Sequence, residues 1–170
     1  DVTLSPNRHD SPEGLVTVAQ EAENLGYEYV SFGETSGWDT ISLLTLLGSH
    51  TDTVGITNEV INPFSRSPGQ IAQAAASVQT VADGRLRVSL GTSSPPLVEG
   101  WHGLEFNRPL RRLRETVEIV KIALSGEEVT YDGEIFTPEG FELDAPTPVE
   151  VPVDVAALGP KAVELAGRFA

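Results

Sequence analysis

The sequence contains no cysteine and only three histidines among its 170 residues. Without a thiol, the chain can form no disulfide, no thiolate nucleophile and no cysteine-based zinc site. The histidines, His9, His50 and His102, are scattered along the chain, which argues against a metal cage built from them. The composition therefore predicts no metal site.

Lysine is also scarce, with Lys121 and Lys161 as its two occurrences. The 25 acidic residues outnumber the 11 basic ones and give a formal net charge of −14. Such a charge repels phosphate backbones, so we expect no nucleic-acid partner. An acidic, lysine-poor surface is typical of a halophilic cytoplasm, because strongly hydrated carboxylates keep a protein soluble in high salt; an ordinary acidic enzyme is the alternative.

No run of 18 apolar residues occurs, which predicts that no segment crosses a membrane. The sequence begins at Asp1 and shows no basic segment followed by an apolar one, so we expect no signal peptide and a cytoplasmic location. A processed or truncated N-terminus stays open. The hydrophobic content of 39% and the length indicate one globular domain over residues 1–170.

The sequence does contain a regular alternation of short apolar runs and amphipathic helical patterns. Helices are predicted to begin after the N-caps Ser11, Asp39, Ser67 and Asn107, and at Gly159-Pro160. Strands alternating with helices of this length indicate parallel βαβ units. The predicted strands cover residues 2–4, 29–32, 54–61, 86–90 and 151–158. The predicted apolar helix faces include Leu15, Val18, Ala19, Ala22 and Leu25 in the first helix and Ile71, Ala75, Val78 and Val81 in the third.

Two segments interrupt this alternation. Residues 92–106 are predicted to be an irregular loop after the fourth strand. Residues 126–148 are predicted to form a small β-hairpin insertion, because an Asp132-Gly133 turn separates the apolar runs 129–131 and 135–136. The insertion is too short and too polar to be a domain of its own.

Five parallel units are compatible with an open Rossmann-like sheet and with a (β/α)8 barrel of the TIM type. The first strand is followed by Ser-Pro-Asn-Arg-His at residues 5–9 and not by the G-x-G-x-x-G of dinucleotide-binding folds, so we favour the barrel. A full barrel needs about 250 residues, so the chain corresponds to about the first five of eight βα units. The first and fifth strands would be unpaired edges, which predicts a fragment or one piece of an assembly, such as a homo-oligomer, that completes the sheet.

In such a barrel, functional residues lie where strands end and loops begin. We expect five junctions to meet in one pocket: residues 5–10, 33–39, 59–63, 91–96 and 156–160. In the last of these, Gly159-Pro160 at a helix start suits a phosphate, although Gly-Pro also punctuates ordinary turns. In the fourth, Gly91 allows close approach of a ligand and three hydroxyls offer hydrogen bonds, unless the loop is simply solvated.

Several single side chains near these junctions are candidates with two interpretations each. Glu34 ends the second predicted strand, where a carboxylate is costly to bury unless it is paired. It either accepts a hydrogen bond from substrate or coenzyme, or it caps the turn or faces solvent. Trp38 and Asp39 are interpreted first as packing and an N-cap at the start of a helix. Trp101 and His102 either line the mouth of a pocket or anchor the loop in which they lie. The arginines of the fourth helix are interpreted as its solvated face: Arg111, Arg112 and Arg114.

Four stretches, taken in their order and spacing, carry a resemblance to a known family: EAENLGYEYVSFGE, VGITNEVINPFSRSPGQIAQAAASVQTVADGRLRVSLGTSSPP, RPLRRLRETVEIVKIALSGEEVTYDGEIF and VPVDVAALGPKAVELAGRFA. The chain resembles the luciferase-like monooxygenase superfamily over nearly its whole length. It is most similar to the branch that uses the deazaflavin coenzyme F420, including methylenetetrahydromethanopterin reductase-like proteins, and a haloarchaeal source fits its acidic composition. The resemblance implies an oxidoreductase that transfers a hydride between F420 and an organic small-molecule substrate.

The same resemblance implies roles for particular residues. Strand three is expected to end in a bulge that backs the coenzyme ring, formed by Glu59, Val60, Ile61 and Asn62, with a cis peptide bond between Glu59 and Val60. Glu34 is expected beside the ring as the candidate catalytic group. The residues expected to bind the coenzyme phosphate are Ala156, Ala157, Leu158, Gly159 and Pro160, and those expected to line its tail or ring edge are Gly91, Thr92 and Ser93.

The chain also departs from the family pattern. Several F420 enzymes have an acidic residue followed by histidine at the end of strand two, where this chain has Glu34 and Thr35. A general acid–base histidine is therefore missing at that position, and the substrate stays open. Two alternatives to the F420 reading also stay open: an FMN-dependent monooxygenase of the same fold, and an inactive barrel fragment that self-associates.

Overall fold

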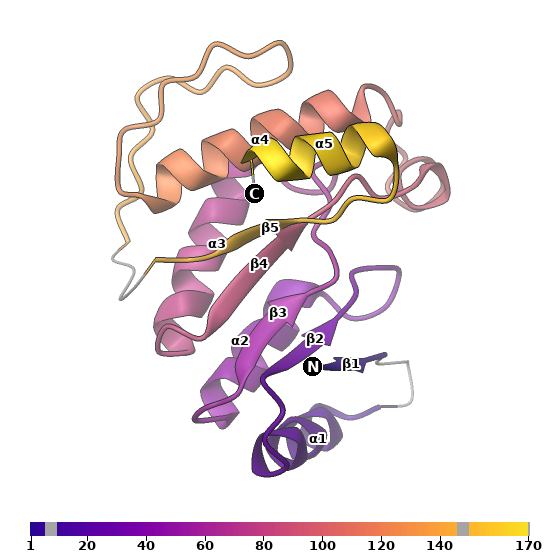
Figure 1. Cartoon of the computed structure of the whole chain (residues 1–170), viewed down its shortest axis with the longest axis vertical. Coiled ribbons are helices and arrows are strands. Elements are labelled where there is room, and N and C mark those ends of the chain that lie inside the picture. Colours follow the sequence, from indigo (N-terminus) through magenta and orange to yellow (C-terminus); the bar gives the residue numbers. More distant parts are fainter. Residues whose placement is uncertain (6–9, 146–149, 170) are drawn as a thin grey trace.

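The computed structural model describes residues 1–5, 10–145 and 150–169 and contains a five-stranded sheet with the order β1-β2-β3-β4-β5 (Figure 1). Each strand pairs in parallel with the next one along the chain, so the predicted βαβ units are confirmed. The strands are β1 Val2–Leu4, β2 Tyr29–Phe32, β3 Gly55–Asn58, β4 Leu86–Leu90 and β5 Val153–Val155. The helices are α1 Pro12–Asn24, α2 Thr40–His50, α3 Pro68–Val81, α4 Pro109–Leu124 and α5 Pro160–Phe169, with one turn of π-helix, η1, at Pro96–Trp101.

Three helices begin where the sequence predicts, because short polar side chains bond the free N–H groups of the first turn. Ser11 caps α1, Asp39 caps α2, and Ser67 forms a reciprocal capping box with Gln70 at the start of α3. None of the helices in the described part of the chain is long and apolar enough to cross a membrane.

The predicted N-cap of α4 is wrong. This helix begins at Pro109, so the cap position is Arg108, which has a left-handed backbone with φ of 46° and makes no side-chain cap bond. Asn107 lies one residue too early to bond the first turn. Proline at the first helical position has no N–H of its own, which reduces the need for a side-chain cap.

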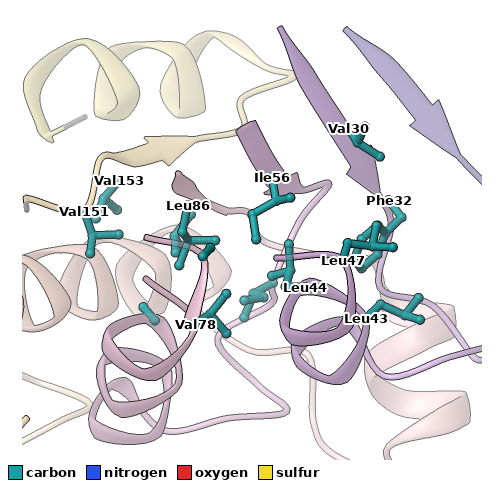
Figure 2. Close-up of a cluster of buried hydrophobic side chains, with 14 of the residues drawn as sticks. Val30, Phe32, Leu43, Leu44, Leu47, Ile56, Val78, Leu86, Val151 and Val153 are labelled. Atoms are coloured by element: carbon teal, nitrogen blue, oxygen red, sulfur yellow. The ribbon is translucent and has the colours of Figure 1, made fainter. Parts of the chain in front are cut away.

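The two faces of the sheet differ in polarity because strand residues point to alternate sides. The helix-facing side is apolar and buried, as Figure 2 shows for strand residues that pack against α2 and α3. Its members include Val30, Phe32, Ile56, Leu86 and Val153 from the strands and Leu43, Leu44, Leu47 and Val78 from the helices. The opposite side carries polar residues that bond one another: Thr3, Ser31, Thr57, Arg87, Ser89 and Asp154.

Some predicted boundaries and faces are wrong. β3 ends at Asn58 and β5 covers only Val153–Val155, so both are shorter than predicted. On the predicted apolar face of the first helix, Val18 and Leu25 are 48% and 66% exposed, whereas Leu15, Ala19 and Ala22 are buried. At 100° per residue, Val18 lies roughly 70° from the centre of the buried arc, and Leu25 is the C-cap residue beyond the last residue of α1. Val81, at the end of α3, is also largely exposed.

The chain between α4 and β5 doubles back on itself. Val129 and Phe141 pair as an isolated antiparallel bridge, and a hydrogen bond of 3.1 Å from the N–H of Gly133 to the carbonyl of Phe136 closes the turn. In its described part, residues 126–145, this segment contains no regular strand, and Val129 pairs with Phe141 instead of with residues 135–136. Residues 146–148 of the predicted hairpin lie outside the described residues.

A buried carboxylate holds this excursion against α4. Glu115, 1% exposed, accepts hydrogen bonds from the N–H groups of Glu134, Ile135 and Phe136 at 2.9–3.1 Å. Beside it, Arg112 lies 5.3 Å from the centre of the Phe136 ring and is partly buried. The prediction that Arg112 belongs to a solvated helix face is therefore wrong.

Candidate functional site

The carboxyl ends of β2, β3, β4 and β5 lie against one another. A Cβ atom placed on Gly33 would lie 2.9 Å from the carbonyl oxygen of Glu59. One placed on Gly91 would lie 2.5 Å from Cγ2 of Val60 and 3.3 Å from Cβ of Ala156. These positions must be small because the bulge after β3 presses against its neighbours on both sides. At the first junction, Pro6 and His9 lie outside the described residues, as does everything between them.

The bulge itself is a one-residue insertion into β3. Thr57 is paired with Arg87 and Ile61 with Leu90, so β3 has one more residue than β4 between these two pairs. The peptide bond between Glu59 and Val60 is cis, as predicted.

A buried side chain replaces the hydrogen bonds that the bulge interrupts. The amide of Asn58, which is fully buried, donates to the carbonyl of Ser89 at 2.6 Å and accepts from its N–H at 3.0 Å. Beyond the bulge the ladder resumes, with the N–H of Gly91 donating to the carbonyl of Ile61 at 3.1 Å. Asn58 therefore keeps β3 attached to β4 at the tip.

The four residues predicted to back a ring divide into two pairs. Ile61 and Asn62 are only 1% and 3% exposed. Asn62 accepts hydrogen bonds from the N–H groups of Phe64 and Ser65, so its side chain shapes the following turn. Val60 is half-buried and Glu59 is exposed. The side chains available to a ligand at this tip are therefore those of Glu59 and Val60.

Glu34 lies at the end of β2 in an ion pair that the sequence did not reveal. Its Oε1 accepts a hydrogen bond from Arg66, which also pairs with Asp39. The side chain of Glu34 is only 10% exposed, and its Oε2 is buried without a hydrogen-bond partner among the described residues. Burial raises the pKa of Asp39, but hydrogen bonds from Ser42 and the charge of Arg66 outweigh it and lower that pKa below its ordinary value.

A cavity of about 700 Å³ lies beside this ion pair. Glu34 and Arg66 line it from the strand tips, and Trp38, Trp101 and His102 line it from the α2 start and the segment after β4. The pocket-lining interpretation of Trp101 and His102 is thus the correct one. A half-satisfied carboxylate next to two indole rings suits a planar ligand that carries hydrogen-bond donors.

The remaining predicted residues lie at the tips of β4 and β5. Ser93, two residues after Gly91, has a left-handed backbone with φ of 62°. The N–H of Ala156 donates to the carbonyl of Leu90 at 2.8 Å, which attaches the β5 tip to the β4 tip. Leu158 is fully exposed, and α5 begins two residues later at Pro160.

A second cavity, of about 390 Å³, lies on the polar side of the sheet. Glu59 lines it together with Tyr29, Arg87 and Asp154. Arg87 and Asp154 form an ion pair, with Nη2 of Arg87 3.0 Å from Oδ1 of Asp154. The alternation of polar residues in the strands could have predicted that this side of the sheet is polar. It could not have predicted which of these residues pair with one another. Within the described residues, no group of three histidine or carboxylate side chains is arranged to hold a metal ion.

Comparison with known proteins agrees with this geometry. The profile of the luciferase-like monooxygenase family matches residues 2–170. A 5,10-methylenetetrahydromethanopterin reductase of Archaeoglobus fulgidus is 33% identical over 83% of this chain and 46% of its own length. An F420-dependent glucose-6-phosphate dehydrogenase of Gordonia bronchialis is 33% identical over 92% of this chain and 51% of its own length.

Among solved structures, the coenzyme F420-dependent tetrahydromethanopterin reductase of Methanopyrus kandleri superposes with a TM-score of 0.91 at 23% identity, covering 99% of this chain and 53% of that one. The chain thus spans about half the length of the curated relatives that it matches. The family match over residues 2–170, together with the relatives at 33% identity, shows that the chain belongs to the luciferase-like monooxygenase family.

Proposed function

We propose that this chain is the coenzyme-binding part of an oxidoreductase that moves a hydride between coenzyme F420 and an organic small-molecule substrate. The observation that carries the proposal is the convergence of three strand tips at Gly91, where Val60 of the bulge and Ala156 both lie against the Gly91 position. By its name, the Gordonia bronchialis relative depends on F420, which supports the same coenzyme here.

The residues present fit a planar ring with a phosphate-bearing tail. Gly33 and Gly91 lie where a Cβ atom would collide with the bulge, so the two glycines let the neighbouring strand tips pack directly against it and fix it as a backing for a ring. Oε2 of Glu34, which has no hydrogen-bond partner among the described residues, offers an acceptor to a ligand donor. The bound coenzyme supplies the hydride chemistry, while the protein binds and orients it.

Two junctions would hold the rest of the coenzyme. Residues 91–93 would line the ring edge or tail, because they follow the tip of β4, where the Gly91 position lies against Val60 of the bulge. Residues 156–160 would bind the phosphate, because the first N–H groups of α5 have no partner within the helix and carry its positive dipole end. Glu34, which lines the larger cavity, is the candidate catalytic group on the substrate side.

A coenzyme titration tests this proposal. F420 is added to the chain while its absorbance and fluorescence are followed, with FMN titrated in parallel. We expect F420 to bind and FMN to bind at least tenfold more weakly. Retention of FMN alone would favour the monooxygenase alternative, and binding of neither coenzyme would contradict the proposal.

A glycine pair supplies the matched variants. In Gly91→Ala the new Cβ would collide with Val60, so F420 affinity should fall at least tenfold. In Gly100→Ala the new Cβ meets no atom within 4 Å, so affinity should change less than twofold. Equal affinities for the two variants would show that the ring does not rest on the bulge.

We further propose that the chain corresponds to the first five units of an eight-stranded barrel, with residues 126–148 as an insertion, and that it acts as a homo-oligomer in the cytoplasm of a halophilic archaeon. The edges β1 and β5 each pair with one strand in the described sheet, which supports association. Light scattering should give at least a dimer, and a monomer that binds no coenzyme would favour the inactive fragment.

The net charge of −14 predicts a thermal midpoint that rises between low and molar KCl.

A further inference from the structure

The two carboxylates at the strand tips are held in different ways. Glu34 is paired with a cation, Arg66. Glu59 forms no ion pair with any of the described residues; instead its Oε1 accepts hydrogen bonds from the hydroxyls of Ser31 at 2.8 Å and Thr3 at 3.2 Å. Hydroxyl donors fix the direction of a carboxylate without neutralising its charge. All hydrogen bonds from the described residues go to Oε1, so none of these residues uses the accepting capacity of Oε2 of Glu59.

The position of Glu59 makes this oxygen relevant to the coenzyme. Glu59 is one partner in the cis peptide bond of the bulge, and Val60, the other partner, contacts the Gly91 position. Its side chain lies on the polar side of the sheet and lines the cavity of about 390 Å³. A ring that rests on Val60 therefore brings one edge within reach of this carboxylate.

We propose that Oε2 of Glu59 accepts a hydrogen bond from the N–H at the pyrimidine edge of the coenzyme ring. This inference rests on the proposed function and adds a recognition contact to it. Deazaflavin and flavin rings both carry this N–H between two carbonyl groups, and an ionised carboxylate is its strongest protein acceptor. Arg87, which lines the same cavity as Glu59, is paired with Asp154 and forms no ion pair with Glu59.

The competing role for Glu59 is structural. Its bonds to Ser31 and Thr3 connect the tip of β3 to β2 and β1, and they could be its whole purpose. Glu59→Gln separates the two roles, because the amide keeps one acceptor oxygen for the hydroxyls and replaces the other oxygen with a donor. Glu28→Gln is the matched control, since Glu28 lines the same cavity from the opposite end of β2.

The experiment measures F420 and FMN affinities of wild type, Glu59→Gln and Glu28→Gln, together with their thermal midpoints. The same three proteins are titrated with a 5-deazaflavin and with its N3-methylated form, which lacks the N–H. We expect Glu59→Gln to weaken coenzyme binding at least tenfold and Glu28→Gln less than twofold. N3-methylation should weaken binding to wild type at least tenfold, and to Glu59→Gln less than twofold.

Each other outcome overturns the inference in a recognisable way. A lower midpoint for Glu59→Gln with unchanged affinity assigns Glu59 the structural role alone. An equal loss on N3-methylation in wild type and in Glu59→Gln means that another group bonds the ring N–H. If wild type binds neither coenzyme, the proposed function fails first, and that result is visible before any variant is compared.

Discussion

Two regions of this molecule are each built around a buried carboxylate, and they differ in how completely that carboxylate is satisfied. In the excursion after α4, both oxygens of Glu115 accept backbone N–H groups, from residues 134, 135 and 136. At the strand tips, one oxygen of Glu34 bonds Arg66 and the other has no partner among the described residues. Complete satisfaction by the protein marks a structural anchor, whereas a buried acceptor left open marks a place for a ligand.

The largest effect on the free energy of unfolding should come from replacing Glu115, the carboxylate that anchors the excursion to α4. Replacing Glu115 by Gln introduces a donor against three backbone N–H groups, so the free energy of unfolding should fall by about 2–4 kcal/mol. Urea denaturation measures the loss, and hydrogen exchange should be fastest in residues 126–145. Glu164→Gln, which removes one partner of an exposed i,i+4 ion pair with Arg168 on α5, is the control and should cost less than about 1 kcal/mol. Similar losses for the two variants would contradict the anchoring role.

The second-largest effect on stability should come from Asn58, which attaches the bulge after β3 to β4. Asn58→Ala leaves the N–H of Ser89 buried without its partner at the bulge, so the free energy of unfolding should fall by about 1–3 kcal/mol. Coenzyme affinity should fall as well, because the Glu59–Val60 tip is no longer fixed to β4. Asn107→Ala, at an exposed position, should change neither quantity. Unchanged coenzyme binding in a destabilised Asn58→Ala protein would show that the bulge does not support the ligand.

The open carboxylate should behave in the opposite way to Glu115. Glu34→Gln keeps an acceptor oxygen for Arg66, and Arg66 keeps its ion pair with Asp39, so the free energy of unfolding should fall by only about 1 kcal/mol. F420 affinity should fall about tenfold, measured by the same titration. A stability loss as large as that of Glu115→Gln would remove the distinction between the two regions.

The smallest effect concerns a third carboxylate, Glu23, which is only partly buried and whose Oε1 accepts three backbone N–H groups. Partial burial raises the pKa of Glu23, but hydrogen bonds from the N–H groups of Thr53, Val54 and Asp52 outweigh it and lower the pKa to about 2. Because the folded state lowers this pKa, Glu23 stabilises the fold above pH 4.5 and that contribution is lost as the pH falls towards 2. Solvent screening limits it to less than about 1 kcal/mol.

Comparing the pH dependence of unfolding for wild type and Glu23→Gln measures this contribution. The difference between the two proteins should be constant above pH 5 and should shrink below it. A difference that grows on acidification would contradict the assigned direction.

The comparison also shows which features could be predicted from sequence. Ser11, Asp39 and Ser67 were predictable as caps because a cap bonds residues two or three positions away. The cis bulge was predictable from the resemblance of the whole segment around Pro63, not from a local rule. Arg66, Asn58 and Glu115 were not predictable, because their partners lie roughly 20 to 30 residues away and only the assembled sheet brings them together. Asn107 shows the limit of local rules, since the proline after Arg108 set the helix start.

The central claim is that the strand tips gather around one planar coenzyme, and a crystal structure of the chain with F420 tests it most directly. We expect the ring against Val60 and the Gly91 position, with a ring N–H at Glu59 and the phosphate at residues 156–160. A ring bound away from the strand tips would contradict this arrangement.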